Sequence, residues 1–550
     1  MLKFIVSIVT AIGLFFSSFG MIMQGNSVVE YKVDAGKTGE TIPNIVDNVN
    51  VWEMGDTFCN VENNPKYDIF NFVEYVQLMQ CSGGNSVRDL FKNPSDRTVL
   101  DDYDFTKLIN NCRGILKLGA KPHLKLGSVP QKFTTADDIG YFEVNLYPPD
   151  DYKQYYEYIK AIAAALVEEF GLAEVKTWRF GCMTEFENSD WFMAKGGDPK
   201  ESATAFCKLY DYTVQALIDV IGKDVFVGAH SMSVTEGLWK EELFIKHCAN
   251  GKNYANGGVG ARICFLSASF YDSCPGKYTS GFTLPQTIAH LKKCAEGYGL
   301  KNLIYGVDEG RILSGNTRGA SDDQLLSRTT GFTYQAGYDA RLFKQAVDSG
   351  ADYFSSWDFL TNGLLSGYPT ISYHIANNIY KFAGSKKADV NASKVIARAG
   401  VETDCLAGWN EEKQTLRLMA YNFKNDVDYS KKMKVRFDVN VPQLDGQTVK
   451  ITKYLVDDNC NFFDEWQQDR KKYGITDDCF NWSPDDGLIE NGTVLKYGWA
   501  RDLYVSKLRD KYEECAQLVP ITQTMTVKDG KIRLEDVLDG NNVVFYEIAK

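Results

Sequence analysis

Residues 151–182, DYKQYYEYIKAIAAALVEEFGLAEVKTWRFGC, decide the fold class of this chain. The pair Asp150-Asp151 opens a helix that is predicted over residues 151–170, and Gly171 ends it. Residues 176–182 then form a short predicted strand. The apolar residues that recur at helical spacing are Tyr155, Ile159, Ile162, Leu166 and Phe170. A helix that leads directly into a strand is the repeating unit of an α/β protein.

The same alternation continues on both sides of this unit. Another clear helix is predicted over residues 104–118, with Gly119 as its end. Further strands are predicted at residues 46–52, 76–81, 121–127, 225–229, 263–268, 303–307 and 353–357. Eight strand–helix units between residues 40 and 384 predict a (β/α)8 TIM barrel. A doubly wound open sheet is the alternative, and it is disfavoured because no glycine-rich phosphate loop follows the first strand.

Beyond residue 385 the apolar period changes from helical spacing to two. The alternating residues include Met433, Val435, Phe437, Val439 and Val441. Asp529-Gly530 predicts a hairpin turn. This pattern indicates a C-terminal β-sandwich domain over residues 385–550, interrupted by helical insertions near 466–473 and 501–518. Residues 28–34 also alternate, and we expect them to add a strand to that domain.

The N-terminus has the pattern of a signal peptide over residues 1–20. Lys3 precedes an apolar run at residues 4–16, and small residues follow at 17–20. We therefore expect an exported protein, secreted or held at the cell surface or in the periplasm. An uncleaved membrane anchor is the alternative, although the run is short for a membrane span.

The amino-acid composition argues against some classes of binding partner. A net charge of −12 without a long lysine or arginine run argues against nucleic acid and anionic membranes. The 13% aromatic content suits either a large core or flat surfaces for sugar rings. No metal-ligand spacing or phosphate loop is evident, so neither a metal nor a cofactor is expected. The 13 cysteines leave pairings such as Cys274–Cys294 and Cys460–Cys479 open, and the oligomeric state is open too.

Two glutamates follow strands that face each other across the predicted barrel. Glu185 follows the fourth strand in Met183-Thr184-Glu185, and Glu309 follows the seventh in Asp308-Glu309. Functional groups of TIM barrels lie where strands end, so both side chains are expected in one cavity. A glutamate at a loop edge is usually just solvated, but two at these positions indicate glycoside hydrolysis. Carboxyl groups about 5–5.5 Å apart retain the anomeric configuration, and about 6.5–9.5 Å gives inversion.

The segment VKTWRFGCMTEFENSDWF, residues 175–192, resembles the acid/base motif of glycoside hydrolase family 39, the β-xylosidase and α-L-iduronidase family. The resemblance continues in order along nearly the whole mature chain. It passes through YDFTKL, GAKPHLKLGSVP, VGAHSM, CFLSASFYD, LIYGVDEGR, SGYPTISYHIANNIYKF and ITKYLVDDNCNFFDEW.

The resemblance implies specific roles. Glu185 takes the position of the acid/base and Glu309 that of the nucleophile. Tyr271 matches a tyrosine that contacts the nucleophile, and Trp357 matches the aromatic floor of the sugar site, although both could be core aromatics.

This chain departs from the family pattern at three positions. Thr184 replaces the asparagine that holds the sugar 2-hydroxyl, Phe186 replaces a proline, and Ser269 replaces a histidine. These changes put plain β-xylosidase specificity in question more than glycosidase activity.

Other polar and aromatic residues are candidates for substrate contact beside Thr184. They are His123, Lys125, His230 and Trp191, each of which could instead be structural. We predict a retaining glycosidase that removes a terminal sugar from an oligo- or polysaccharide. The alternatives are an α-L-iduronidase-like or other family 39 specificity, or an inactive sugar-binding relative.

Overall fold

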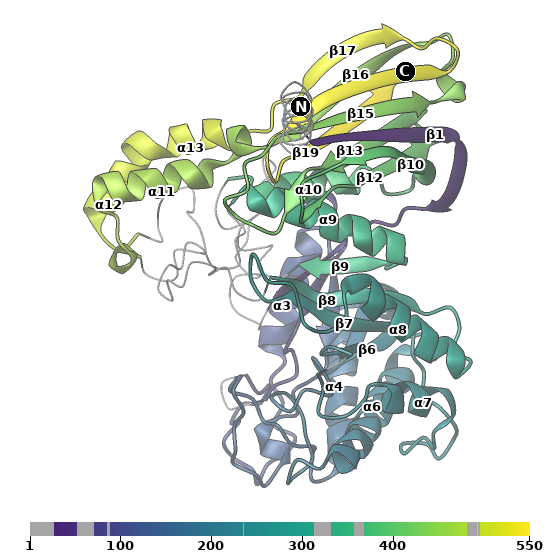
Figure 1. Cartoon of the computed structure of the whole chain (residues 1–550). Coiled ribbons are helices and arrows are strands. Elements are labelled where there is room, and N and C mark those ends of the chain that lie inside the picture. The colour runs from purple at the N-terminus through teal and green to yellow at the C-terminus, as the bar shows by residue number, and fades with distance from the viewer. Residues whose placement is uncertain are drawn as a thin grey trace, which may run out of the picture. The chain divides into compact units, whose positions relative to one another are not determined.

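The computed structural model describes residues 27–51, 71–84, 88–234, 236–312, 332–356, 368–480, 492 and 495–550. The predicted signal peptide lies outside these residues. The chain divides into two units (Figure 1). One comprises Thr41–Gly384 and Asp458–Leu518, and the other comprises the described part of Met1–Glu40, Ser385–Asp457 and Val519–Lys550. None of the helices in the described part of the chain has the length and apolar character needed to cross a bilayer.

Eight parallel strands close into a barrel in the first unit, which confirms the predicted (β/α)8 fold. Pairing of Val49 with Ser356 joins the last strand to the first, so an open sheet is excluded. The barrel strands are β2 (Asn48–Val51), β3 (Tyr75–Leu78), β4 (Lys121–Lys125), β5 (Arg179–Cys182), β6 (Val227–Ser231), β7 (Phe265–Asp272), β8 (Ile304–Ile312) and β9 (Tyr353–Ser356).

Strands β7 and β8 run further than the sequence predicted, to Asp272 and Ile312. Glu309 therefore lies inside β8 rather than after it. The pairing of β7 with β8 shifts its register between Ala268 and Ser269, and that of β8 with β9 shifts between Val307 and Gly310. Such irregularities re-aim side chains, and periodicity does not reveal them.

Helices follow the strands and pack against one another around the barrel (Figure 1). They are α3 (Thr106–Lys117), α4 (Tyr152–Phe170), α5 (Leu172–Val175), α6 (Pro199–Ile221), α7 (Glu242–Asn250), α8 (Leu284–Gly297), α9 (Tyr334–Ser349) and α10 (Ile371–Tyr380). The Asp151 side chain caps α4 by accepting from the Lys153 amide. Gly171 ends it at φ +82°, a conformation that disfavours other residues.

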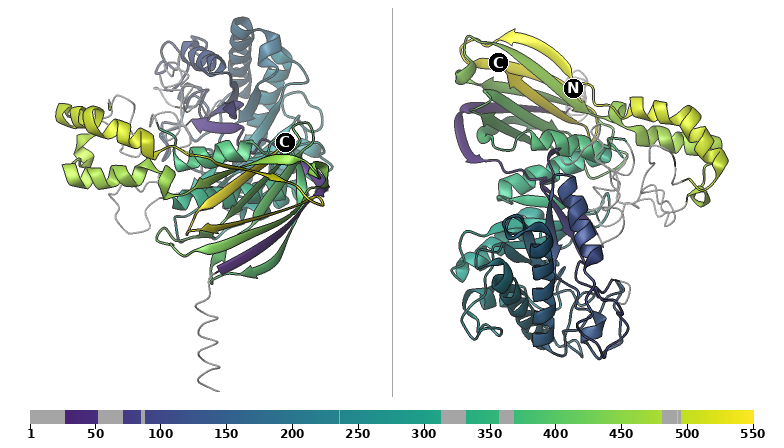
Figure 2. Two further views of the ribbon diagram at one scale, coloured as in Figure 1. Left: turned by 90° about the horizontal axis from the view of Figure 1, so that it is seen from above. Right: turned by 180° about the vertical axis from the view of Figure 1, so that it is seen from behind.

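Residues 458–518 group with the barrel unit, whereas the sequence pattern placed them in the C-terminal region. They form α11 (Phe462–Tyr473), α12 (Gly498–Leu503) and α13 (Arg509–Cys515), with a π-helical turn at Tyr504–Leu508. Figure 2 shows these helices in yellow-green from two directions. Buried aromatic rings of this segment pack with Tyr368, which precedes α10.

The second unit contains a nine-stranded sheet in the order β17-β16-β19-β13-β12-β10-β1-β15-β18. Its strands are β1 (Ser27–Thr41), β10 (Lys386–Ile396), β12 (Cys405–Asn410), β13 (Thr415–Tyr421), β15 (Met433–Asn440), β16 (Thr448–Val456), β17 (Ile521–Thr526), β18 (Lys531–Leu538) and β19 (Val543–Ala549). Strand β1 pairs in parallel with β15. A separate pair joins β11 (Val401–Glu402) to β14 (Phe423–Lys424).

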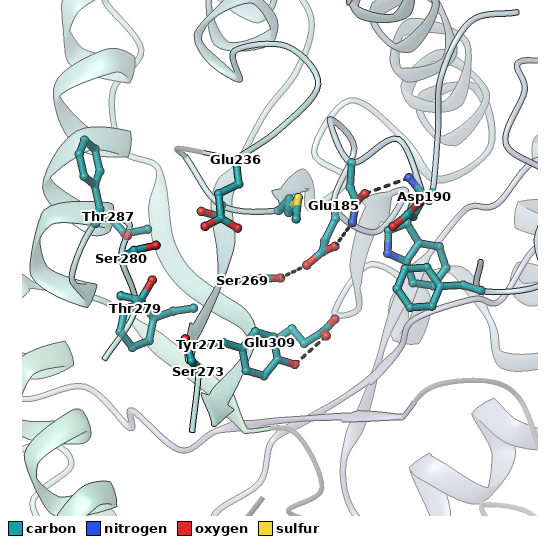
Figure 3. A pocket seen from close by; sticks show the side chains of 17 residues that line it. Glu185, Asp190, Glu236, Ser269, Tyr271, Ser273, Thr279, Ser280, Thr287 and Glu309 are labelled. Carbon is teal, nitrogen blue, oxygen red and sulfur yellow. Dashed lines mark hydrogen bonds between the residues drawn. The ribbon is translucent and has the colours of Figure 1, made fainter. Parts of the chain in front are cut away.

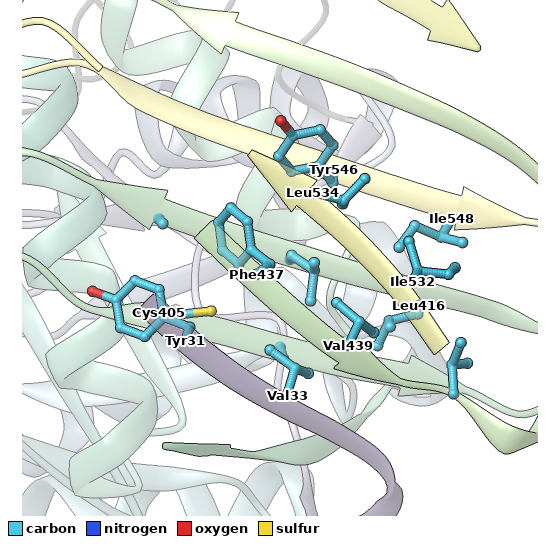
Figure 4. Close-up of a cluster of buried hydrophobic side chains, with 14 of the residues drawn as sticks. Tyr31, Val33, Cys405, Leu416, Phe437, Val439, Ile532, Leu534, Tyr546 and Ile548 are labelled. Atoms are coloured by element: carbon cyan, nitrogen blue, oxygen red, sulfur yellow. The ribbon is translucent and has the colours of Figure 1, made fainter. Parts of the chain in front are cut away.

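This sheet folds back on itself around one apolar core (Figure 4). Phe437 on β15 and Tyr546 on β19 are separated by four strands in the sheet order, yet their ring centroids are 5.7 Å apart. The Phe437 ring also stacks with Tyr31 of β1. The alternation that the sequence shows along residues 433–441 thus lines the inside of two facing layers.

Candidate active site

A cavity of about 400 Å³ opens where β5, β6, β7 and β8 end (Figure 3). Its lining includes both predicted catalytic residues, Glu185 and Glu309, together with the predicted contacts Trp191 and Tyr271. Two further carboxylates that the sequence did not single out, Asp190 and Glu236, also line it. The two glutamates therefore converge on one cavity, as the predicted barrel required.

Glu185 is buried, with 8% of its surface exposed, and its backbone has a φ of +43°. Asn188 Nδ2 donates a hydrogen bond to Oε2 at 2.7 Å, and Ser269 Oγ donates to Oε1 at 2.5 Å. Burial raises the pKa of Glu185, and these two hydrogen bonds oppose that rise in part. A carboxyl with a raised pKa keeps its proton and can serve as a general acid.

Glu309 is half-buried in β8, where the Tyr271 hydroxyl donates to its Oε1 at 2.6 Å. An oxygen of its carboxylate and one of Glu185 lie within 4.8 Å of each other. This spacing is close to the separation of about 5–5.5 Å in retaining pairs and lies below the about 6.5–9.5 Å of inverting pairs.

Ser269 connects Glu185 to His230, which the sequence nominated as a substrate contact. His230 Nε2 lies 2.9 Å from Ser269 Oγ, and burial lowers the pKa of His230 to about 3, so the imidazole is neutral. Ser269 has one proton and donates it to Glu185, so His230 Nε2 carries the hydrogen that Ser269 accepts. The Nδ1 atom of His230 has no hydrogen-bond partner in the described structure, so no acceptor there requires a hydrogen on Nδ1.

A histidine of the neighbouring strand β6 thus lies against Ser269, the position at which the family resemblance implied a histidine. Alternation along β7 places Ser269 on the same face as Tyr271, which was the signal available in the sequence. Glu185, His230 and Glu309 are also close enough to hold a cation, but Ser269 already hydrogen-bonds to Oε1 of Glu185 and Nε2 of His230.

Lys125 forms a fully buried ion pair with Asp308, the residue before Glu309. The Asp308 carboxylate also accepts a hydrogen bond from the Tyr353 hydroxyl. The backbone carbonyl of Asp308 accepts hydrogen bonds from the side-chain amides of Asn50 and Gln77, at 3.0 Å each. Burial alone would raise the pKa of Asp308, but the Lys125 ammonium holds it below its ordinary value. These contacts fix the backbone next to Glu309.

The predicted substrate contacts His123, Lys125 and His230 do not line the cavity. His123 is fully buried against the Phe265 ring, and neither ring nitrogen has a hydrogen-bond partner among the described residues. Burial lowers the pKa of His123 well below its usual value. The arrangement therefore gives these three residues a position behind the site.

The remaining candidates differ in their placement. Thr184 Oγ1 donates to the Met79 carbonyl at 3.0 Å and is buried, so its hydroxyl is held by the backbone. Trp191 stacks on Phe142 with ring centroids 4.5 Å apart, and both rings line the cavity. Trp357 lies outside the described residues.

The cysteines contribute no covalent link in the described structure. None of the twelve described cysteines is joined to another described cysteine, so neither Cys274–Cys294 nor Cys460–Cys479 is a disulfide.

Comparison with known proteins gives a consistent result. Residues 85–477 match the model of the family described as Glycosyl hydrolases family 39. A beta-xylosidase of Geobacillus stearothermophilus is 28% identical over 142 residues, 25% of this chain and 27% of that protein. A beta-xylosidase of Caldicellulosiruptor saccharolyticus is 21% identical over 322 residues, 56% of this chain and 62% of that protein. The chain thus aligns with less than two thirds of either curated relative.

A solved structure shares the fold over almost the entire chain. The GH39 enzyme from Xanthomonas axonopodis pv. citri superposes with a TM-score of 0.65 at 14% identity, covering 96% of this chain and 98% of that one.

Proposed function

This chain belongs to glycosyl hydrolases family 39, and from that premise we propose that it is a retaining glycosidase that removes a terminal sugar from an oligo- or polysaccharide. Glu309 attacks the anomeric carbon while Glu185 gives its proton to the leaving oxygen, so the glycosidic bond breaks as an ester forms. Glu185 then takes a proton from water, whose oxygen displaces Glu309 and releases the sugar.

The single observation that carries the proposal is the approach of the two carboxylates to within 4.8 Å in one cavity. Their environments also differ in the direction the mechanism needs. Burial favours the protonated form of Glu185, whereas the Tyr271 hydroxyl donates to Glu309 and favours its anion. Esterification of Glu309 removes a neighbouring negative charge, which lets Glu185 lose its proton and act as the base in the second step.

Two variants test these roles. We expect Glu309→Gln to abolish turnover of aryl glycosides, because an amide cannot form the ester. Glu185→Ala should lose activity but recover it with azide on substrates with good leaving groups, since a small anion fits the vacated space. Glu169→Gln, an exposed carboxylate on α4, serves as the matched control and should keep wild-type activity.

The stereochemistry is tested by NMR detection of the first-formed anomer. Retention is expected, and an inverted product or full activity in Glu309→Gln would end the proposal. Calorimetry that shows oligosaccharide binding without hydrolysis over a long incubation would instead identify an inactive sugar-binding relative.

The cavity supports a neutral sugar over a uronate. Among the described residues its lining carries four carboxylates, Glu185, Asp190, Glu236 and Glu309, and no lysine or arginine. A uronate carboxylate would meet this negative surface without a cation to pair with it. A panel of aryl glycosides should therefore show hydrolysis of a neutral glycoside such as a β-xyloside and little of an α-L-iduronide.

We also propose that the protein is exported, on the basis of the signal pattern at residues 1–20. Sequencing the N-terminus of protein recovered outside the cytoplasm tests this, and an intact Met1 on a purely cytoplasmic protein would refute it.

A further inference from the structure

Three potential metal ligands of different chemistry meet outside the cavity. Glu241 directly precedes α7, and His290 and Cys294 lie four residues apart on α8, so they share one helix face. His290 Nε2 lies 2.5 Å from Glu241 Oε1 and 3.5 Å from Cys294 Sγ. One ligand atom from each residue lies within 4.8 Å of the other two.

These distances can be compared with those of a tetrahedral zinc site. Zn–S bonds of about 2.3 Å and Zn–N bonds of about 2.0–2.1 Å at tetrahedral angles place sulfur and nitrogen about 3.6 Å apart. The 3.5 Å between Cys294 Sγ and His290 Nε2 matches that spacing. The carboxylate oxygen would need to move from 2.5 Å to about 3.4 Å from the imidazole nitrogen, a small rotation of the Glu241 side chain.

Exposure and charge suit an ion that enters from solvent. The Glu241 side chain is 6% exposed, whereas that of His290 is 29% exposed, so the imidazole lies on the solvent side of the cluster. Cys294 is half-buried, and burial together with Glu241 and Glu242 raises the pKa of its thiol. The same two glutamates favour a cation at this point, which would in turn stabilise the thiolate.

We propose that Glu241, His290 and Cys294 form a zinc-binding site with a fourth position open to water. A thiolate, an imidazole and a carboxylate together select zinc over magnesium or calcium, which prefer oxygen ligands alone. The site lies beside the cavity wall, because the His290 ring packs on that of Phe282, with centroids 5.6 Å apart, and Phe282 lines the cavity. The proposal does not rest on glycosidase activity.

Cobalt absorbance tests the site directly. The full chain is treated with chelator, kept reduced, and titrated with Co²⁺, which reports a bound thiolate through a sulfur-to-metal charge-transfer band. We expect the band to saturate at one equivalent and to disappear when Zn²⁺ is added. The cluster of Glu185, His230 and Glu309 contains no sulfur, so it cannot produce this signal.

Matched variants assign the signal. Cys294→Ser should lose the band, whereas Cys274→Ser, which alters another half-buried cysteine, should keep it. His290→Gln keeps the thiol and should weaken Zn²⁺ binding at least about tenfold. Zn²⁺ should raise the thermal unfolding midpoint of the wild type but not of Cys294→Ser, which also checks that the variant folds. No saturable band in the wild type, or a band retained by Cys294→Ser, would overturn the proposal.

Discussion

Replacement of Lys125 by methionine removes the cation from the buried pair that holds Asp308 next to Glu309. Both side chains of this pair are 0% exposed, so among the described residues the carboxylate left behind keeps the hydrogen bond from the Tyr353 hydroxyl and no cation. Removal of one partner from a buried pair destabilises a protein by about 3–5 kcal/mol, against about 0–1 kcal/mol for an exposed pair. We expect Lys125→Met to lower the free energy of unfolding by about 3–5 kcal/mol near neutral pH.

The pKa of Asp308 determines how the stability loss should change with pH. The pKa of Asp308 is depressed in the folded wild type, so its contribution is present above the unfolded value of about 3.9 and is lost as pH falls. Without Lys125, burial dominates and raises that pKa. The variant should then lose stability as pH rises above about 4, and its deficit should shrink toward acid pH.

Urea denaturation followed by tryptophan fluorescence measures the effect. Lys176→Met is the matched control, because Lys176 pairs with Asp224 at 3.0 Å with side chains 36% and 67% exposed. The double variant Lys125→Met/Asp308→Asn should recover most of the loss, since no uncompensated charge remains. A deficit below about 1 kcal/mol, or one that does not change with pH, would refute the reasoning.

Three further variants probe the site. Ser269→Ala removes the 2.5 Å hydrogen bond that favours ionised Glu185, so the pKa of Glu185 should rise. The alkaline limb of the kcat/KM–pH profile should therefore move to higher pH. An unmoved limb would contradict the assigned contact. Tyr271→Phe removes a 2.6 Å hydrogen bond to Glu309 worth about 1.5 kcal/mol, so kcat/KM should fall roughly tenfold, and unchanged kinetics would exclude the role. Burial raises the pKa of Glu187 to about 8, so the wild type should lose stability between the unfolded value of about 4.3 and pH 8. The side chain of Glu187→Gln cannot ionise, so the thermal unfolding midpoint of this variant should fall less from pH 5 to pH 8 than that of the wild type. Equal falls in the two proteins would contradict this prediction.

The fold class was predictable because its signals are local. The helical spacing from Tyr155 to Phe170 and the glycine that ends α4 act within a few residues of each other, and both hold in the structure. The eightfold alternation then limits the architecture, since parallel strands joined by helices form either a closed barrel or a doubly wound open sheet. Glu185 and Glu309 could be nominated for the same reason, because the carboxyl ends of barrel strands meet at one face.

What those residues contact was decided by barrel closure alone. Alternation along β4 could place Lys125 inward, but its partner Asp308 lies 183 residues away in sequence. His230 reaches Glu185 only through Ser269 on the next strand, and the register shift beside Ser269 leaves no trace in the apolar pattern. Sequence periodicity records which face of an element is buried, because burial acts on each residue separately. Pairing between distant side chains depends on the register and tilt of strands, which exist only once the barrel has closed.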